Sequence, residues 1–470
     1  MSSIKNSLAV FRALFENIVD LPYCTGTVPL DPSSATLFYR LTANTAGYGT
    51  RFLWWSVSWL DLRTINFSNP SEDQLSALAE ACQKATFGLN QKDVLDETYR
   101  KAGKMDTADF ATQFSPTTCG IIDIIHDKLL RGPSIEKSIK VEPYKLNVYG
   151  VYIAHHSWIP PECLISLGPG SFFKAHVDTP RSDKMFGSLV VIFPTPHEGG
   201  SLVFRHGGQE CTFDTARAVS SQELPHVAFV AFYSDVEHEV SVVTSGYRVT
   251  LTYNLYWEDS PSPKSNPGII ANSTSLEQMK ATLESLLADP EFSHSGRRLG
   301  FGLSHKYPFN PNTTRLEELE ERLKGSDART MNICKALSLN VSLKALYTTK
   351  DDWNNGKGCL LDHFAGLDAE LMEGEVIEDD LLHHLERKHG ATLVHGLEVA
   401  RGYHLPILWV KPPANFNSFQ QTYMAHGNEA TPDHAYGEVC LVAEMGETKK
   451  RRGMVRNVGS LTDSDSDSDW

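Results

Sequence analysis

The sequence predicts an α+β protein with an antiparallel β-sandwich or barrel at its centre. Short segments of alternating apolar and polar residues follow one another between residues 144 and 257, separated by glycine- and proline-rich turns. No helical pattern lies between these segments, which argues against the strand–helix alternation of a parallel sheet. Helical patterns gather before and after this stretch, so helices are expected to cover or flank the sheet.

At 470 residues the chain exceeds a single compact core, and its composition suggests five regions. We expect a mainly helical support region over 1–139 and the strand-rich core over 140–258. A linker rich in Ser and Pro follows over 259–272. A mixed α/β region is predicted over 273–445, with a structural or recognition role and no catalytic residues. Residues 446–470 have the composition of a disordered tail.

The N-terminal region shows three helical patterns. Apolar residues at helical spacing predict an amphipathic first helix over 8–18 that packs on the body. A second helix is expected from Pro70 to Lys84, with Asn69 as its cap, and a third over 120–130. The charged stretch 93–114 between them is either a solvated loop and helix or a flap that faces the substrate.

Strand and helix patterns in the later regions are separated by clear turn signals. In the core, strands are predicted at residues 144–149, 187–193, 201–206, 227–233 and 246–257. In the C-terminal region, helices are predicted near 274–288, 315–324 and 327–337, and strands near 341–348, 405–410 and 438–443. The helix at 327–337 is expected to be capped by Ser326 or Asp327.

Charge and cysteine usage restrict the function and the compartment. The formal net charge of −15 argues against general nucleic-acid binding and against an anionic membrane surface. Eight cysteines without a C-x-x-C pair indicate buried thiols in a reducing compartment, and no apolar run predicts a membrane span or a signal peptide. We therefore expect an intracellular protein, cytoplasmic or nuclear. The basic cluster Lys449–Arg452 is either a nuclear import signal or part of a solvated tail.

The motif His176-Val177-Asp178 places two metal-binding side chains on one predicted strand. Residues i and i+2 of a strand point to the same face, so His176 and Asp178 can bind one ion from adjacent positions. His238 is the candidate third ligand. Two imidazoles and one carboxylate on one face leave room for a bidentate oxo-acid and dioxygen, as non-haem Fe(II) requires. No cysteine lies near enough in the sequence to suggest zinc.

The last predicted strand of the core has one polar and one apolar face. Within 247–255 the even-numbered residues are polar and the odd-numbered ones are apolar. If the apolar face packs under helices, Arg248 and Thr250 point into the cavity beside the metal. A buried guanidinium needs an anion, so Arg248 is expected to bind a carboxylate, with Thr250 as a further donor. The alternative is a surface arginine on an edge strand.

These residues resemble the 2-oxoglutarate- and Fe(II)-dependent dioxygenase superfamily, in particular its prolyl 4-hydroxylase-like branch. That pattern is H-x-D, a distal His, and a basic residue ten positions later with a hydroxyl two beyond it. The matching positions are His176, Asp178, His238, Arg248 and Thr250. The segments Glu198–Phe204 and Ser234–Val240 also resemble that branch, and the flanks 85–114 and 423–430 resemble a fungal set of such proteins. Animal collagen enzymes differ by carrying Lys where Arg248 stands.

The resemblance implies a double-stranded β-helix (jelly-roll) core with covering helices over roughly 140–257. It also implies that a tyrosine nine residues before the H-x-D histidine binds the co-substrate, but Leu167 stands there. Removing residues 151–168 brings Tyr149 to that spacing. The segment is either an in-frame insertion, such as a translated intron, or an ordinary surface loop; sequencing the transcript tests the intron.

The resemblance implies an enzyme that uses Fe(II), 2-oxoglutarate and O2, with ascorbate as a candidate reductant. The first hypothesis is a hydroxylase of a C–H bond in a protein or peptide side chain that releases succinate and CO2. The second is an oxygenase of a small metabolite, and the third is a catalytically weak metal-binding or oxygen-sensing scaffold. Arg181 and Arg100 are candidate substrate-binding residues, although plain surface charges are the alternative. His305 is expected to be structural or exposed, since it lacks metal-ligand spacing.

Overall fold

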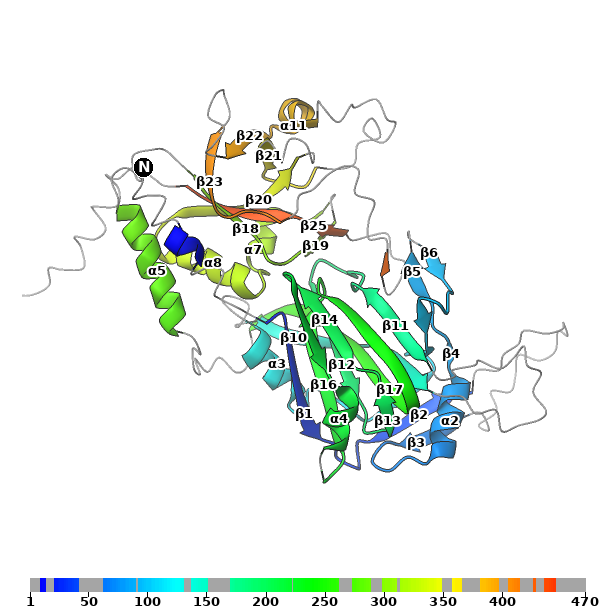
Figure 1. Ribbon diagram of the computed structural model, residues 1–470. Helices are drawn as coiled ribbons and strands as arrows, with labels where there is room; N and C mark the ends of the chain where they lie inside the picture. Colours follow the sequence, from blue (N-terminus) through cyan, green and yellow to red (C-terminus); the bar gives the residue numbers. More distant parts are fainter. Residues whose placement is uncertain are drawn as a thin grey trace, which may run out of the picture.

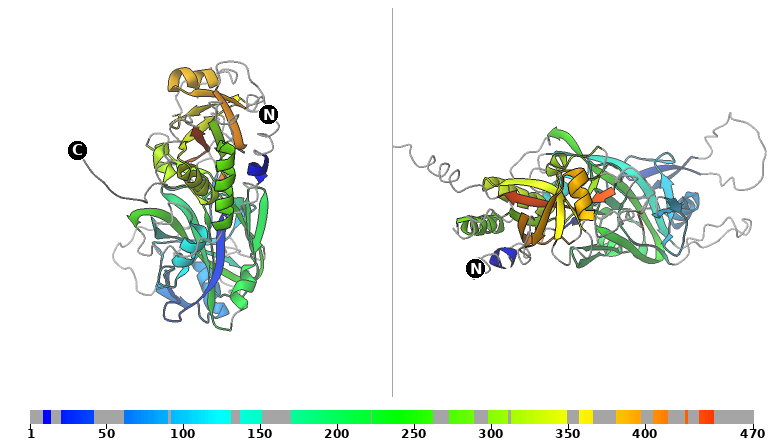
Figure 2. Two further views of the ribbon diagram at one scale, coloured as in Figure 1. Left: turned by 90° about the vertical axis from the view of Figure 1, so that its left-hand side faces the viewer. Right: turned by 90° about the horizontal axis from the view of Figure 1, so that it is seen from above.

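The structure is a computed structural model of the chain. It describes residues 9–13, 21–41, 62–89, 92–130, 137–150, 170–221, 223–261, 273–288, 298–310, 313–348, 357–365, 381–396, 405–414, 426–427 and 435–444. The described residues form two lobes, each with a buried apolar core of its own (Figures 1 and 2). The predicted linker after Pro261, the segment 151–169 and the tail lie outside the described residues.

The larger lobe is built on two layers of antiparallel strands that share the long strand β17 (Glu237–Pro261). The first layer has the order β1 (Tyr23–Pro29), β16 (His226–Tyr233), β12 (Met185–Ile192), β17, β10 (Lys137–Gly150), β8 (Gly103–Asp106) and β4 (Gln83–Lys84). The second layer contains β7 (Arg100–Lys101), β11 (Ser171–His176), β13 (His197–Gly199), β14 (Leu202–His206) and β15 (Gln209–Phe213) beside the first half of β17. The antiparallel core predicted from the alternating pattern is therefore present.

A change of direction in β17 joins the two layers. Its first part pairs with β11, β13 and β14, and its second part pairs with β10 and β12. The change occurs at Gly246, which has φ +69° and lies so close to Pro196 that a Cβ atom would sit 2.1 Å from the Pro196 carbonyl oxygen. Only glycine fits this backbone at no steric cost. Residues before Gly246 thus face the site from one layer, and residues after it from the other.

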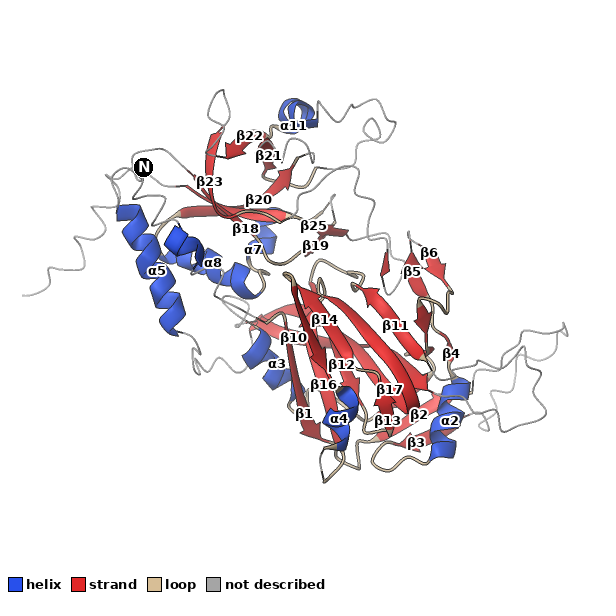
Figure 3. Ribbon diagram, viewed as in Figure 1, coloured by secondary structure: helices blue, strands red, loops and turns tan. Residues whose placement is uncertain are grey.

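Short helices and small sheets surround this core (Figure 3). The helices are α2 (Glu72–Ala81), α3 (Ile121–Leu129) and α4 (Thr215–Ser220). The small sheets are formed by β2 (Thr36–Arg40), β3 (Leu62–Asn66) and β9 (Phe110–Thr112), and by β5 (Phe87–Leu89), β6 (Lys92–Val94) and β24 (His426–Gly427). The pairing of β24 with β5 brings residues 426–427 beside residues 88–89, although they are far apart in the sequence.

The N-terminal region differs from its prediction, because strands outnumber helices among its described residues. The charged stretch 93–114 forms β-strands, with β8 added to the edge of β10, and not a loop and helix. Helix α2 begins later than expected because Ser71 and Gln74 form a capping box that replaces Asn69 as the cap. The helical turn at 9–13 places Phe11 in the core of the other lobe, where Arg12 donates to the Trp409 carbonyl.

The core contains one helix that the sequence did not predict. Helix α4 lies between β15 and β16 and is only six residues long, too short to show a helical period. The Asp214 carboxylate accepts a hydrogen bond from the Arg217 backbone and caps it. This helix carries Thr215, which contacts the functional site described below.

The smaller lobe is a closed barrel with helices around it. The barrel strands are, in order, β18 (Arg298–Gly302), β23 (Leu405–Lys411), β22 (Thr392–Gly396), β21 (Lys357–Leu361), β20 (Asn340–Tyr347) and β26 (Val439–Glu444). The remaining elements are α5 (Ser273–Ala288), α7 (Leu316–Glu320), α8 (Gly325–Ala336), α11 (Leu381–His389), β19 (Tyr307–Phe309) and β25 (Ala435–Gly437). The mixed α/β composition expected here is present, with both parallel and antiparallel pairs.

The cap predicted for the helix at 327–337 is wrong. Helix α8 begins at Gly325, and the residue in the cap position is Lys324, whose side chain makes no capping bond. The Asp327 carboxylate instead accepts hydrogen bonds from the backbone of Ser304 and His305. A tertiary contact has therefore replaced the local cap.

Two further expectations concern cysteines and membranes. Each cysteine that the structure describes is a free thiol, in line with the absence of a disulfide pattern in the sequence. Among the described residues, none of the helices combines the length and apolar character needed to cross a bilayer.

Candidate metal centre

Three side chains predicted as metal ligands meet between the two layers. His176 ends β11, Asp178 follows it, and His238 is the second residue of β17, directly opposite His176 in the strand register. One ligand atom from each residue lies within 4.8 Å of the other two. All three residues are buried. Two imidazoles and a carboxylate thus converge from one side, as the i, i+2 pattern predicted.

Backbone carbonyls orient both imidazoles. The Nδ1 atom of His176 lies 2.8 Å from the Lys174 carbonyl oxygen, and that of His238 lies 3.0 Å from the Val236 carbonyl oxygen. A ring that donates from Nδ1 presents a lone pair at Nε2, which is the form that binds a metal. The His238 Nε2 atom lies 3.9 Å from Asp178 Oδ1, so both donors face the same point.

Burial and neighbouring side chains hold His176 and Asp178 in states that can bind a cation. Burial, followed by the proximity of His238, lowers the pKa of His176 well below its ordinary value, so the imidazole is neutral at pH 7. The Ser188 hydroxyl donates to Asp178 Oδ2 and leaves Oδ1 directed toward His238. Ser188, on β12, was missed in the sequence because only the fold brings it near Asp178.

Arg248 lies in the same cavity, in an environment that has no anion among the described residues. Its side chain is only 1% exposed, and burial lowers the pKa of its guanidinium to about 10. Nε donates to the Thr215 hydroxyl at 3.3 Å, whereas Nη2 has no partner in the described part of the chain. Gly200 makes room for it, since a Cβ atom there would lie 2.6 Å from Arg248 Cδ. A buried cation with an unsatisfied donor fits an anionic ligand.

Tyr149 and Thr250 flank this guanidinium. Tyr149 is paired with Arg248 across β10 and β17, and its ring centroid lies 5.3 Å from Arg248 Cζ. Thr250 is 1% exposed and also lines the cavity. The structure therefore brings all three predicted co-substrate residues together.

The cavity that joins these groups encloses about 590 Å³ of empty space, including its opening to solvent. Its walls are lined partly by apolar residues and partly by polar residues of β10 and β17. The apolar residues include Phe173, Val190, Leu202, Phe232 and Val240. Lys145 and Asn147 also line it and were missed, although their alternation with Tyr149 along one strand indicates a shared face.

The two predicted substrate residues occupy different positions. Arg100 is buried in the cavity wall, where it stacks on Phe173 and donates to Asn147 Oδ1 at 2.9 Å and to the Thr86 carbonyl. Its Nε atom has no partner among the described residues. Arg181 is not part of the cavity wall, but Tyr144 is. The Arg181 guanidinium lies 4.5 Å from the ring centroid of Tyr144. Neither arginine is therefore a plain surface charge, which was the alternative in the sequence analysis.

The comparisons with known proteins agree with this geometry. Residues 163–256, about a fifth of the chain, match the model of the 2OG-Fe(II) oxygenase superfamily. The chain carries a 2OG-Fe(II) oxygenase superfamily domain. Such a domain implies a jelly-roll core, and the family uses Fe(II), 2-oxoglutarate and O2. The match includes both segments that carry the predicted metal ligands, and Arg248.

Two solved structures show distant similarity to this chain. A 2OG-Fe(II) oxygenase family oxidoreductase from Burkholderia pseudomallei is 17% identical, with a TM-score of 0.18, and the match covers 27% of this chain and 49% of that one. The match thus spans about half of that protein. A Pseudomonas putida prolyl-4-hydroxylase is 14% identical, with a TM-score of 0.23 and coverage of 53% and 99%. No curated protein matches the sequence.

The residues present fit the groups that the family uses. The nitrogen and oxygen donors of His176, Asp178 and His238 are those that Fe(II) accepts, and no other protein ligand from the described residues joins them. The Nη2 atom of Arg248, which has no partner in the described part of the chain, fits a carboxylate of 2-oxoglutarate. Both requirements of a 2-oxoglutarate-dependent dioxygenase site are therefore met in one cavity.

Proposed function

We propose that the protein is a 2-oxoglutarate-dependent dioxygenase that hydroxylates a C–H bond in a protein or peptide side chain. The observation that carries the proposal is the shared cavity: a buried His-Asp-His face and a buried guanidinium, which has no anion among the described residues, open into the same space. A structural barrel has no use for either arrangement, since each costs free energy unless a ligand satisfies it.

His176, Asp178 and His238 would hold Fe(II) on one face. Bound Fe(II), 2-oxoglutarate and O2 supply the oxidation, in which one oxygen atom enters the substrate C–H bond and the other enters succinate as CO2 leaves. The two carbonyl-bound imidazoles fix the direction of their Nε2 lone pairs before the metal arrives. Ser188 holds the Asp178 carboxylate in one orientation.

Arg248 would bind the distal carboxylate of 2-oxoglutarate, with Thr250 and Tyr149 beside it. The charge of that carboxylate compensates the buried guanidinium, and its oxygens satisfy Nη2. Since Arg248 is almost fully buried, water competes poorly for this pairing. The apolar wall formed by Val190, Leu202 and other residues limits water near the reacting atoms.

Arg100 would contact the substrate at the other part of the cavity, and Arg181 would contact it from behind the wall residue Tyr144. Support comes from Arg100 Nε, which has no partner among the residues that the structure describes, and from the stacking of Arg181 on Tyr144, a wall residue. An acidic or carbonyl-rich segment of a peptide fits these donors. The choice of a peptide over a small metabolite rests on the resemblance of Glu198–Phe204 and Ser234–Val240 to the prolyl 4-hydroxylase-like branch.

Mass spectrometry after incubation with Fe(II) and 2-oxoglutarate under air tests the proposal. We expect peptides from a proteome digest to gain the mass of one oxygen atom, and we expect the gain to require both additions. An oxygen gain confined to small metabolites would contradict the peptide assignment and support the second hypothesis. The absence of any oxygenated product, together with no succinate, would contradict the enzyme assignment and leave a scaffold.

A further inference from the structure

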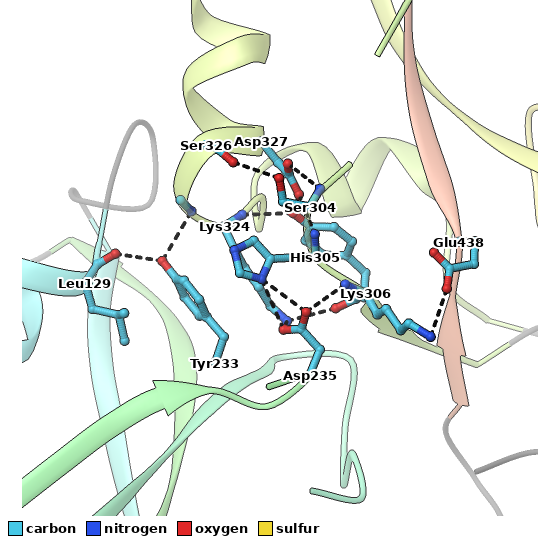
Figure 4. A network of polar contacts seen from close by, with 12 residues as sticks. Leu129, Tyr233, Asp235, Ser304, His305, Lys306, Lys324, Ser326, Asp327 and Glu438 are labelled. Atoms are coloured by element: carbon cyan, nitrogen blue, oxygen red, sulfur yellow. Dashed lines mark hydrogen bonds and ion pairs between the residues drawn. The ribbon is translucent and has the colours of Figure 1, made fainter. Parts of the chain in front are cut away.

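A buried ionic cluster joins the smaller lobe to the turn that precedes β17 (Figure 4). Asp235 lies in that turn and belongs to the oxygenase lobe. Lys324 Nζ donates to Asp235 Oδ1 at 2.8 Å, and His305 Nδ1 lies 3.1 Å from Oδ2. The Lys306 backbone also donates to Oδ2 at 2.9 Å. One carboxylate thus receives three donors from the other lobe.

The charged groups of this cluster are buried, so they must pair with one another. The side chains of Asp235 and Lys324 are each 1% exposed and that of His305 is 3% exposed. Although burial raises the pKa of Asp235, Lys324 and His305 hold it well below its ordinary value. Removing one partner of such a pair leaves an uncompensated buried charge, which strongly destabilises the fold. The lobes therefore dock at this point in one geometry.

The smaller lobe fixes its own donors before they meet Asp235. Lys324 Nζ also donates to the Lys306 carbonyl at 2.9 Å. Asp327, at the start of α8, accepts hydrogen bonds from the backbone of His305 and from the Tyr307 hydroxyl. The carboxylate of the turn therefore enters a site whose donors are already held in place.

The turn leads directly to a predicted metal ligand. The Val236 backbone donates to the Tyr233 carbonyl and closes the turn around Asp235. The Val236 carbonyl is the group that accepts from Nδ1 of His238. Tyr233 is anchored as well, because its hydroxyl donates to the Leu129 carbonyl at 2.7 Å and accepts from the Gly325 backbone. The position of the His238 ring thus depends on a turn held by the smaller lobe.

A second metal site is the other reading of this cluster. His206, Asp235 and His305 have ligand atoms within 4.8 Å of one another. However, the Lys324 ammonium already neutralises Asp235 at hydrogen-bond distance. A divalent cation at the same carboxylate would lie close to this buried like charge, which disfavours it. The cluster is therefore better suited to joining the lobes than to binding a metal.

We propose that Asp235 and Lys324 are positioning residues, through which the smaller lobe holds His238 in its metal-binding orientation. The C-terminal region then supports the metal centre through this turn and is not only a recognition domain. This inference rests on the proposed function only in that His238 binds a metal ion. It predicts that the metal affinity changes when a residue of the smaller lobe is replaced.

The test compares two variants of the full chain, Lys324→Met and Arg322→Met. Arg322 is the matched control, because it pairs with Asp183 of the oxygenase lobe at 2.7 Å but does not touch the turn. Titration with Co(II), followed by its visible absorption, reports both affinity and ligand geometry. We expect Lys324→Met to bind Co(II) about 10- to 100-fold more weakly, with an altered spectrum. Arg322→Met should bind within about twofold of the wild type.

Two further measurements keep the test decisive if Lys324→Met fails to fold. The double variant Asp235→Asn, Lys324→Met leaves no buried unpaired charge and should fold, again with weakened Co(II) binding. In the wild type, binding at His238 should slow amide hydrogen exchange at 304–307 and 324–330, because linkage is reciprocal. Wild-type affinity and spectrum in a folded Lys324 variant, or unchanged exchange on adding Co(II), would overturn the inference.

The outcomes also separate this inference from the proposed function. If the wild type binds Co(II) but forms no succinate from 2-oxoglutarate with Fe(II), the proposed enzyme activity is contradicted. The Co(II) affinities of the variants still test the positioning role in that case. A wild type that turns over normally, with a Lys324→Met variant of equal affinity, contradicts the positioning role alone. A wild type that binds no metal contradicts both.

Discussion

At the scale of single residues, Arg248 is a buried cation whose partner must come from outside the described chain. Replacing it with Met removes one charge-assisted pair, and such pairs contribute about 1.5–3 kcal/mol. We therefore expect Arg248→Met to raise the KM for 2-oxoglutarate about 10- to 100-fold, measured by succinate formation. The exposed Arg217→Met on α4 serves as the control. An unchanged KM would contradict the assignment of the carboxylate to Arg248.

Lys145 gives a prediction in pH. Burial lowers the pKa of its ammonium to about 8; Asp106 raises it, whereas Arg100 and Arg181 lower it further. In the unfolded chain a lysine has a pKa of about 10.4. Below pH 8 the ammonium is charged in both states, and its burial lowers the free energy of unfolding by the full amount. Between pH 8 and about 10 the folded state loses this proton while the unfolded state keeps it, so the free energy of unfolding rises with pH.

We therefore expect the free energy of unfolding of the wild type to rise over that window relative to Lys145→Met. Denaturant titrations from pH 7 to 10 measure the difference. The exposed Lys140→Met is the control and should show a constant difference. A difference that is also constant for Lys145→Met would show that its ammonium is not perturbed.

Four of the residues found from the sequence share one property, which is a spacing of two within or next to a strand. His176, Asp178, Arg248 and Thr250 follow the alternation that sends side chains to one face. His305 shows the opposite case: it contacts Asp235 across 70 positions of the chain, and no local spacing indicates such a contact. It was expected to be structural or exposed, and it is buried in a contact between the lobes.

At the scale of elements, the segment 151–168 interrupts the chain between β10 and β11 without separating them. The Ser171 hydroxyl donates to the Gly150 carbonyl at 3.0 Å, so the chain leaves and returns at nearly the same place. Tyr149 keeps its pairing with Arg248. The strands therefore do not depend on the length of what joins them.

Deleting residues 151–168 should leave the fold and the site intact. We expect the melting temperature to stay within about 5 °C of the wild type, since the free energy of closing the chain between two fixed ends depends only weakly on the number of residues between them. The rate of 2-oxoglutarate consumption should be at least that of the wild type. A folded deletion variant without activity would show that the segment belongs to the site.

The limits of prediction at this scale have physical causes. The second half of β17 was found because alternate residues carry different chemistry, one face being polar and the other apolar. The strands β12 and β16 are buried on both faces, and turn signals on either side mark them in the sequence. The N-terminal strands were missed because several are only two to five residues long, too short for an alternation to show. The cap predicted for α8 was wrong because the Asp327 carboxylate accepts a hydrogen bond from the backbone of Ser304, which is distant in the sequence, and does not cap its own helix.

At the scale of the whole molecule, the C-terminal lobe contributes more than the sequence suggested. Its barrel core includes Phe11, from near the start of the chain, and its β24 adds to β5 of the oxygenase lobe. Together with the Asp235 cluster, these contacts join the lobes at separate points. Composition and periodicity could indicate a separate region but not how it docks, because docking depends on contacts between distant residues.

The central claim is that three converging ligands and one buried guanidinium form a working oxygenase site. The most direct measurement is succinate formation from 2-oxoglutarate under air, with and without Fe(II), in the wild type and in Asp178→Ala. We predict Fe(II)-dependent succinate in the wild type and a loss of more than about 100-fold in Asp178→Ala, since loss of a ligand exceeds the effect of its supporting contacts. The exposed Asp73→Asn should match the wild type. Equal turnover in Asp178→Ala, or turnover that ignores Fe(II), would contradict the account.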